Sequence, residues 1–100
     1  MDFEKQAALS RLQRLLDENE ATAGMYARAH GKNLIMGRED TYEGTTEKVD
    51  MVRLTRQTQS RFALRYTRHP GRWERLPFTG DMTELVQLLQ GSLAHVVAPF

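Results

Sequence analysis

The chain contains no cysteine and no long apolar run, and these two absences exclude several classes of protein. Without cysteine there are no disulfides, no thiolate zinc sites and no cysteine nucleophiles, and the composition fits a reducing cytoplasm. No apolar run approaches the roughly 18 residues needed to cross a bilayer. The first ten residues lack the basic start and apolar core of a signal peptide. We therefore expect a cytoplasmic protein without a membrane partner.

Motifs for catalysis and for cofactor binding are also missing. The three histidines, His30, His69 and His95, lie far apart in the sequence and show no metal-ligand spacing. No serine stands in a nucleophile elbow, and no glycine-rich segment has the pattern of a phosphate-binding loop. We therefore expect no cofactor and no metal, and favour a non-catalytic protein. The enzymatic alternative is a site assembled from turn residues near His69.

Length and composition indicate one ordered domain over residues 1–100. The chain is 40% apolar and 27% charged, close to the average soluble globular protein. A chain of this length can bury one modest core. Its net charge is only +1, which argues against a general affinity for polyanions.

Two amphipathic segments predict helices near the two ends of the chain. Between about Phe3 and Asp17, apolar residues cluster on one face at 100° per residue. Asp81 and Glu84 have the spacing of a capping box, and an apolar stripe continues from there to Val97. We expect one helix from about residue 82 to residue 97. A break at Gly91 is the alternative, because glycine destabilises a helix by about 1 kcal/mol relative to alanine.

Between these helices, alternating apolar and polar residues predict antiparallel strands. The expected elements are a hairpin over residues 25–36 and strands over residues 48–56, 61–67 and 72–78. The last strand should stop near Pro77, and the turn before it should be slightly longer than two residues. Antiparallel sheets usually bury one face, and two helices are available to cover it. The predicted class is α+β: a two-layer domain with an antiparallel meander of four to five strands and both helices on one face.

Arginine is concentrated in residues 51–75, where seven arginines, no lysine and one acid leave a local charge of +6. Most of these arginines fall at strand ends or turns, but Arg53, Arg65 and Arg75 are expected on the open face of the sheet. Trp73 joins them there unless a bulge resets its strand. Tryptophan stacks on bases and arginine grips phosphate, so this face predicts RNA or single-stranded DNA binding. The alternative is a solvated face with Arg–Trp packing.

The segment from Glu39 to Asp50 has the opposite charge, with five acids and one lysine. With Gly44 and several threonines, it reads as a mobile loop. Its acids are expected to be solvated, to fold over the basic sheet, or to meet the arginines of a second copy.

The last helix carries more apolar surface than a small core needs, which often marks a subunit contact. The candidate self-association residues are Leu88, Leu93, Val97 and Phe100. The alternative is that the whole stripe covers the chain's own sheet. The function we favour from the sequence is therefore a small non-catalytic domain that acts through protein contacts, as a homodimer. Nucleic-acid binding is second.

Overall fold

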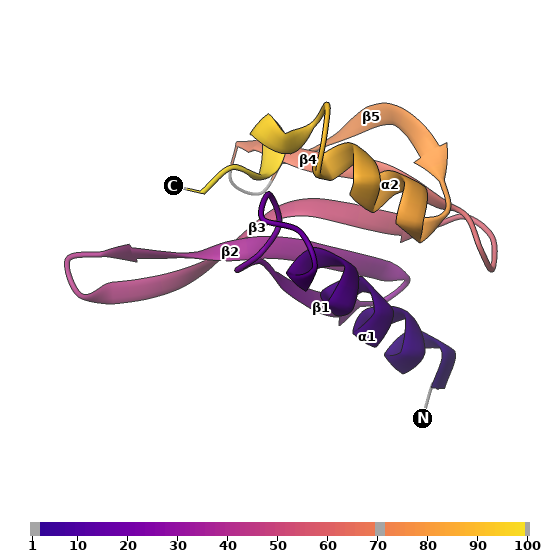
Figure 1. The fold of residues 1–100 in the computed structure, drawn as a ribbon, viewed down its shortest axis with the longest axis horizontal. Coiled ribbons are helices and arrows are strands. Elements are labelled where there is room, and N and C mark those ends of the chain that lie inside the picture. Colours follow the sequence, from indigo (N-terminus) through magenta and orange to yellow (C-terminus); the bar gives the residue numbers. More distant parts are fainter. Residues whose placement is uncertain (1–2, 70–71, 100) are drawn as a thin grey trace.

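The computed structural model describes residues 3–69 and 72–99, which form two α-helices, five strands and a 3-10 helix (Figure 1). In chain order the elements are α1 (Phe3–Asp17), β1 (Tyr26–His30), β2 (Asn33–Tyr42), β3 (Thr45–Arg56), β4 (Phe62–His69), β5 (Arg72–Gly80), α2 (Met82–Leu89) and η1 (Ala94–Val97). The strands form one antiparallel sheet in the order β1-β2-β3-β4-β5. The predicted α+β meander is confirmed.

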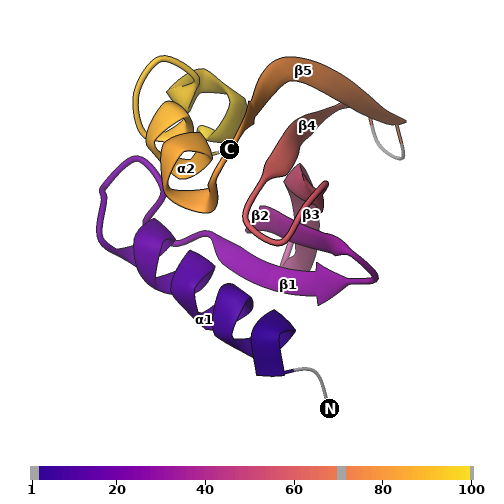
Figure 2. The ribbon, with the colours of Figure 1, turned by 90° about the vertical axis from the view of Figure 1, so that its right-hand side faces the viewer.

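Both helices lie on the same side of the sheet, with α1 beside β1 and α2 beside β5 (Figure 2). Each central strand sends alternate apolar side chains to this side, as the period of two requires. The buried cluster between the helices and the sheet contains Leu12, Leu16, Met25, Leu34, Met36, Val52, Leu54, Phe62, Leu64, Met82, Leu85, Val86, Leu89 and Val97. The core therefore occupies one face of the sheet and leaves the other to polar residues.

The second helix begins as its capping box indicates. The backbone N–H of Glu84 donates to the Asp81 carboxylate at 2.8 Å, and the Asp81 N–H donates back to Glu84 at 3.3 Å. One continuous helix through Val97 is wrong, because α2 ends at Leu89. A straight helix would carry Val97 about 12 Å past Leu89. The break near Gly91 instead turns the chain back, so that Val97 is fully buried in the core.

The acidic segment is not a mobile loop, which corrects the sequence prediction. It is the outer half of the β2–β3 hairpin, paired as far as Tyr42 and Thr45. Glu43 and Gly44 make the two-residue turn with φ of 50° and 80°, the left-handed pair that a tight hairpin needs. Threonine, tyrosine and valine along these strands favour the extended backbone.

The β4–β5 hairpin differs from expectation in two places. His69 is paired with Arg72, so two residues connect the strands and not a longer loop. Those two, Pro70 and Gly71, lie outside the described residues. Strand β5 also continues through Pro77 to Gly80, which is possible because an edge strand tolerates a proline and because its register shifts there.

Gly37 stands where the β2–β3 register shifts, and the neighbouring Tyr26 ring lies directly over it. A Cβ at this position would overlap the carbonyl oxygen of Val49 and the Tyr26 hydroxyl. We expect Gly37→Ala to lower the free energy of unfolding by about 1–3 kcal/mol, measured by urea denaturation. The control is Gly91→Ala, whose Cβ would have ordinary space 3.4 Å from the Gln87 carbonyl oxygen. Equal stability of the two variants would contradict this account.

Candidate nucleic-acid interface

Three arginines stand in one row across the open face of the sheet. Arg53 on β3 is the direct cross-strand partner of Arg65 on β4, and Arg65 is the direct partner of Arg75 on β5. Partners in antiparallel strands point to the same face, and neighbouring strands are about 4.8 Å apart. We call Arg53, Arg65 and Arg75 the arginine ladder. Like charges placed directly opposite each other destabilise a sheet, so the ladder carries an energetic cost.

Two arginine side chains of the ladder are partly buried, but no ion pair balances the charge of the ladder among the described residues. Arg53 and Arg65 are half-buried and Arg75 is exposed. The Nε atoms of Arg53 and Arg65 are buried, and neither has a hydrogen-bond partner in the structure. Within residues 3–69 and 72–99, no carboxylate forms an ion pair with the ladder. Burial, and then the charge of Arg65, hold the pKa of the Arg53 guanidinium below its usual value.

Trp73 lies on the same face as the ladder. Its cross-strand partner is Thr67, and the Arg53 guanidinium carbon lies 4.7 Å from the centre of its ring. This is a cation–π contact, worth about 0.5–1 kcal/mol at a partly exposed site. The structure therefore places Trp73 among the arginines and not under the helices. All four residues predicted for this face, Arg53, Arg65, Trp73 and Arg75, are brought together.

Arg28 on β1 extends the row, but its charge is balanced. Arg28 pairs with Ile35 on β2, and Ile35 pairs with Arg53. The Arg28 guanidinium forms an ion pair with Asp50 at 2.5 Å, and the Tyr26 hydroxyl donates to the same carboxylate at 2.5 Å. The Arg28 hydrogen bonds hold the pKa of Asp50 below its usual value, whereas burial raises the pKa of Tyr26. The uncompensated charge of the row therefore begins at Arg53.

The other predicted site residues are placed differently. Leu88 and Leu93 are half-buried and pack against the core, Val97 is fully buried, and Phe100 lies outside the described residues. Contact with a second copy through Val97 is thus blocked by the chain's own packing. His69 ends β4, and its side chain lies outside the described part of the chain. In that part no group of three or more potential ligands is close enough for a metal ion, and no helix is long and apolar enough to cross a membrane.

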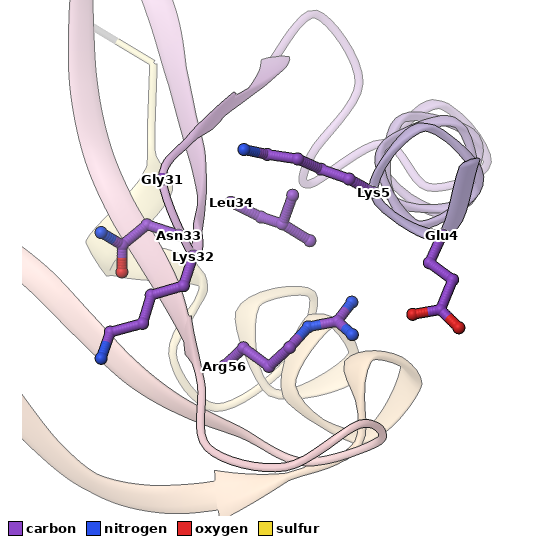
Figure 3. A pocket seen from close by; sticks show the side chains of 7 residues that line it. All are labelled: Glu4, Lys5, Gly31, Lys32, Asn33, Leu34 and Arg56. Atoms are coloured by element: carbon purple, nitrogen blue, oxygen red, sulfur yellow. The ribbon is translucent and has the colours of Figure 1, made fainter. Parts of the chain in front are cut away.

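A hollow of about 280 Å³ lies between the start of α1 and the β1–β2 turn (Figure 3). Leu34 faces it, and the side chains of Lys5 and Arg56 extend over it from opposite sides, with the Glu4 carboxylate near its rim. The hollow therefore mixes both signs of charge. Its lining includes no histidine and no hydroxyl group.

Arg38 has a structural role that the sequence analysis did not anticipate. It is 7% exposed, and its guanidinium donates to the carbonyl oxygens of Val97 at 2.7 Å, Ala21 at 2.8 Å and Ala23 at 3.0 Å. It thereby ties β2 to the segment after α1 and to the end of η1. Arg38 stands two residues after the buried Met36 on the same strand, and alternate residues of a strand point to the same face. This spacing would have indicated that Arg38 faces the core.

Comparison of the chain with known protein families, characterised proteins and solved structures finds no match. A function must therefore be inferred from the chemistry of the arginine ladder and its surroundings. What the ladder offers is three cations in line beside one aromatic ring, on a face that neither helix covers. Such a surface can bind an extended anion.

We expect Arg38→Met to lower the free energy of unfolding by about 2–3 kcal/mol, because three carbonyl oxygens lose a charged donor. Burial already lowers the pKa of Arg38, which shows that the guanidinium sits away from water. Urea denaturation measures the loss. Arg14→Met, on the exposed face of α1, is the matched control and should change stability by less than about 0.5 kcal/mol. Comparable losses in both variants would refute the role given to Arg38.

The Arg28–Asp50 pair predicts a dependence of stability on pH. The pKa of the Asp50 carboxyl is lower in the folded protein than in the unfolded chain, where it is about 3.9. Asp50 therefore stabilises the fold above about pH 3.9, and this stabilisation is lost as the pH falls through the folded pKa. Because Arg28 is 43% exposed, we expect Asp50→Asn to cost only about 1 kcal/mol at neutral pH.

Urea denaturation between neutral pH and pH 3 measures this effect. The stability difference between the parent protein and Asp50→Asn should shrink as the solution becomes acidic. Glu18→Gln, which removes one exposed acid near the end of α1, is the control for a general change in charge. A difference for Asp50→Asn that stays constant with pH would show that the pair is not the cause.

Proposed function

We propose that the protein binds single-stranded nucleic acid, RNA or DNA, along the open face of its sheet. The observation that carries this proposal is the arginine ladder: three cations in direct register, without a carboxylate partner in the described chain. Guanidinium groups bind phosphate through two parallel hydrogen bonds. The Nε atoms of Arg53 and Arg65 are buried, so the terminal nitrogens of these groups are the donors that would meet the phosphate.

The shape of the surface favours a single strand over a duplex. Duplex grooves are usually read by a helix or a β-ribbon that enters them. Both α-helices lie on the other face of this sheet, and the ribbon that projects from it is acidic. A sheet face with cations and a half-buried aromatic ring instead resembles the platforms on which unpaired bases stack while the nucleic-acid backbone follows positive charge.

Trp73 and Arg53 provide the stacking part of this surface. Arg53 lies over the Trp73 ring in the unbound protein. The guanidinium stacks through its flat face, whereas its N–H groups point outward in its plane and can bind a phosphate at the same time. The exposed part of the half-buried Trp73 ring can stack on a base, which contributes about 1–3 kcal/mol.

Protein contact through the last helix is the weaker candidate. Of its four predicted residues, Val97 is fully buried, while Leu88 and Leu93 already pack on the core. The arginine ladder, in contrast, forms no ion pair with any carboxylate of the described residues. We therefore put the open sheet face first.

The test is a titration of a labelled single-stranded oligonucleotide, followed by fluorescence anisotropy. Affinity should fall steeply with salt, with a slope of about −2 in log K against log salt if three phosphates are neutralised. Arg53→Gln with Arg65→Gln should weaken binding at least tenfold at low salt and flatten the slope. Trp73 is the chain's one tryptophan, so quenching of its fluorescence reports contact at this face.

Arg14→Gln is the matched control, since it removes one exposed arginine from α1 on the helix side of the sheet. This variant should bind like the parent protein. A duplex of the same sequence should bind more weakly than the single strand. Absence of binding by any oligonucleotide at low salt would refute the proposal, as would equal losses in the ladder and control variants.

A further inference from the structure

The outer part of the β2–β3 hairpin projects from the body of the protein (Figure 1). Strand β1 pairs with β2 only as far as Gly37, and β4 pairs with β3 only as far as Val52. Beyond them the two strands have no third strand beside them, and every residue from 41 to 48 is exposed. We call residues 39–48 the acidic arm. Two-stranded ribbons of this kind are only marginally stable alone in water, so the arm gains from a contact.

The acidic arm carries a ladder of its own, opposite in sign to the arginine ladder. Four acids, Glu39, Asp40, Glu43 and Glu47, face one base, Lys48. Asp40 and Glu47 are direct cross-strand partners, which places two like charges side by side. Tyr42, close to them at the tip, is 73% exposed. One small chain thus holds two destabilising rows of like charge that complement each other.

The two rows cannot meet within one molecule. Glu47 and Arg53 belong to the same strand, β3, and six residues of extended chain separate their backbones by about 20 Å. The strand is hydrogen-bonded to β2 along this length, so it cannot fold back over its own face. The acidic arm therefore reaches an arginine ladder only if the ladder belongs to another molecule.

We propose that the arginine ladder receives the acidic arm of a second copy of this chain. The Asp40 and Glu47 carboxylates would accept hydrogen bonds from the terminal guanidinium nitrogens of Arg53 and Arg65, because the Nε atoms of both arginines are buried. Repulsion within both ladders would fall at the same time. The arm would also compete with nucleic acid for the ladder. Only this competition rests on the proposed function; the self-association does not.

A charge-swap experiment tests the self-association. In low salt, light scattering and sedimentation should show a mass that rises with concentration in the parent protein and returns to the monomer in high salt. The arm variant, Asp40→Lys with Glu47→Lys, should remain monomeric. The ladder variant, Arg53→Glu with Arg65→Glu, should remain monomeric as well. Mixing the two variants should restore association, because each reversed surface then meets an opposite charge.

The control reverses two exposed acids outside the arm, Glu18→Lys and Glu20→Lys, and should leave association unchanged. Circular dichroism verifies that every variant is folded. A parent protein that stays monomeric at all concentrations in low salt would overturn the proposal, as would folded variants that do not associate when mixed. Association that survives both reversals but is lost in Leu88→Asp would place the contact on α2 instead and would equally refute it.

The outcomes separate this proposal from the proposed function. The arm variant keeps the arginine ladder, so it should bind the oligonucleotide at least as tightly as the parent protein. Self-association without any oligonucleotide binding would refute the nucleic-acid proposal alone. Oligonucleotide binding by a protein that is always monomeric would refute the arm contact alone.

Discussion

The structure depends on one constraint: its five-stranded sheet has helices on one face only. Alternate residues of every strand must therefore remain outside the core. Even so, Ile35 and Ala63 on this outer face are each only 3% exposed. Long arginine side chains can cover apolar neighbours with their stems while their charged ends stay in water, and Ile35 stands in register between Arg28 and Arg53. Arginine on this face thus replaces a third layer.

Covering the open face with arginines introduces repulsion between their like charges. Placing Arg53, Arg65 and Arg75 opposite one another concentrates positive charge, and no carboxylate of the described residues forms an ion pair with them. A Glu or Asp at one of these positions would have relieved the repulsion. Arg28, at the β1 end of the same row, shows the contrast, since it is balanced by Asp50, whose carboxylate also accepts a hydrogen bond from Tyr26. Among the described residues, the ladder is thus the part of the open face whose charge no ion pair balances.

Much of the architecture follows from local pattern. The apolar spacing in residues 3–17, the capping box at Asp81, and the alternation on both sides of Ser60 lead directly to α1, the start of α2, and strands β3 and β4. The alternation of residues in the last strand also left two placements for Trp73, on the open face or, after a bulge, under the helices. The structure has it on the open face. The prediction of one continuous last helix failed because a distant contact decides the outcome, since Val97 packs in the core. The loop prediction failed for a local reason. Charge and threonine content made residues 39–50 look like a loop, although residues 39–42 and 45–48 pair with each other across the Glu43-Gly44 turn.

The residues of the candidate site could be predicted from the sequence, but their arrangement could not. The accumulation of arginine and one tryptophan between residues 51 and 75 can be read directly from the chain, because composition is local information. That Arg53, Arg65 and Arg75 are direct cross-strand neighbours became visible only in the folded sheet, because register depends on turn lengths and bulges summed over several strands. The break in the last helix and the burial of Arg38 also became visible only in the fold. Both depend on how the chain ends pack against strands far away in sequence.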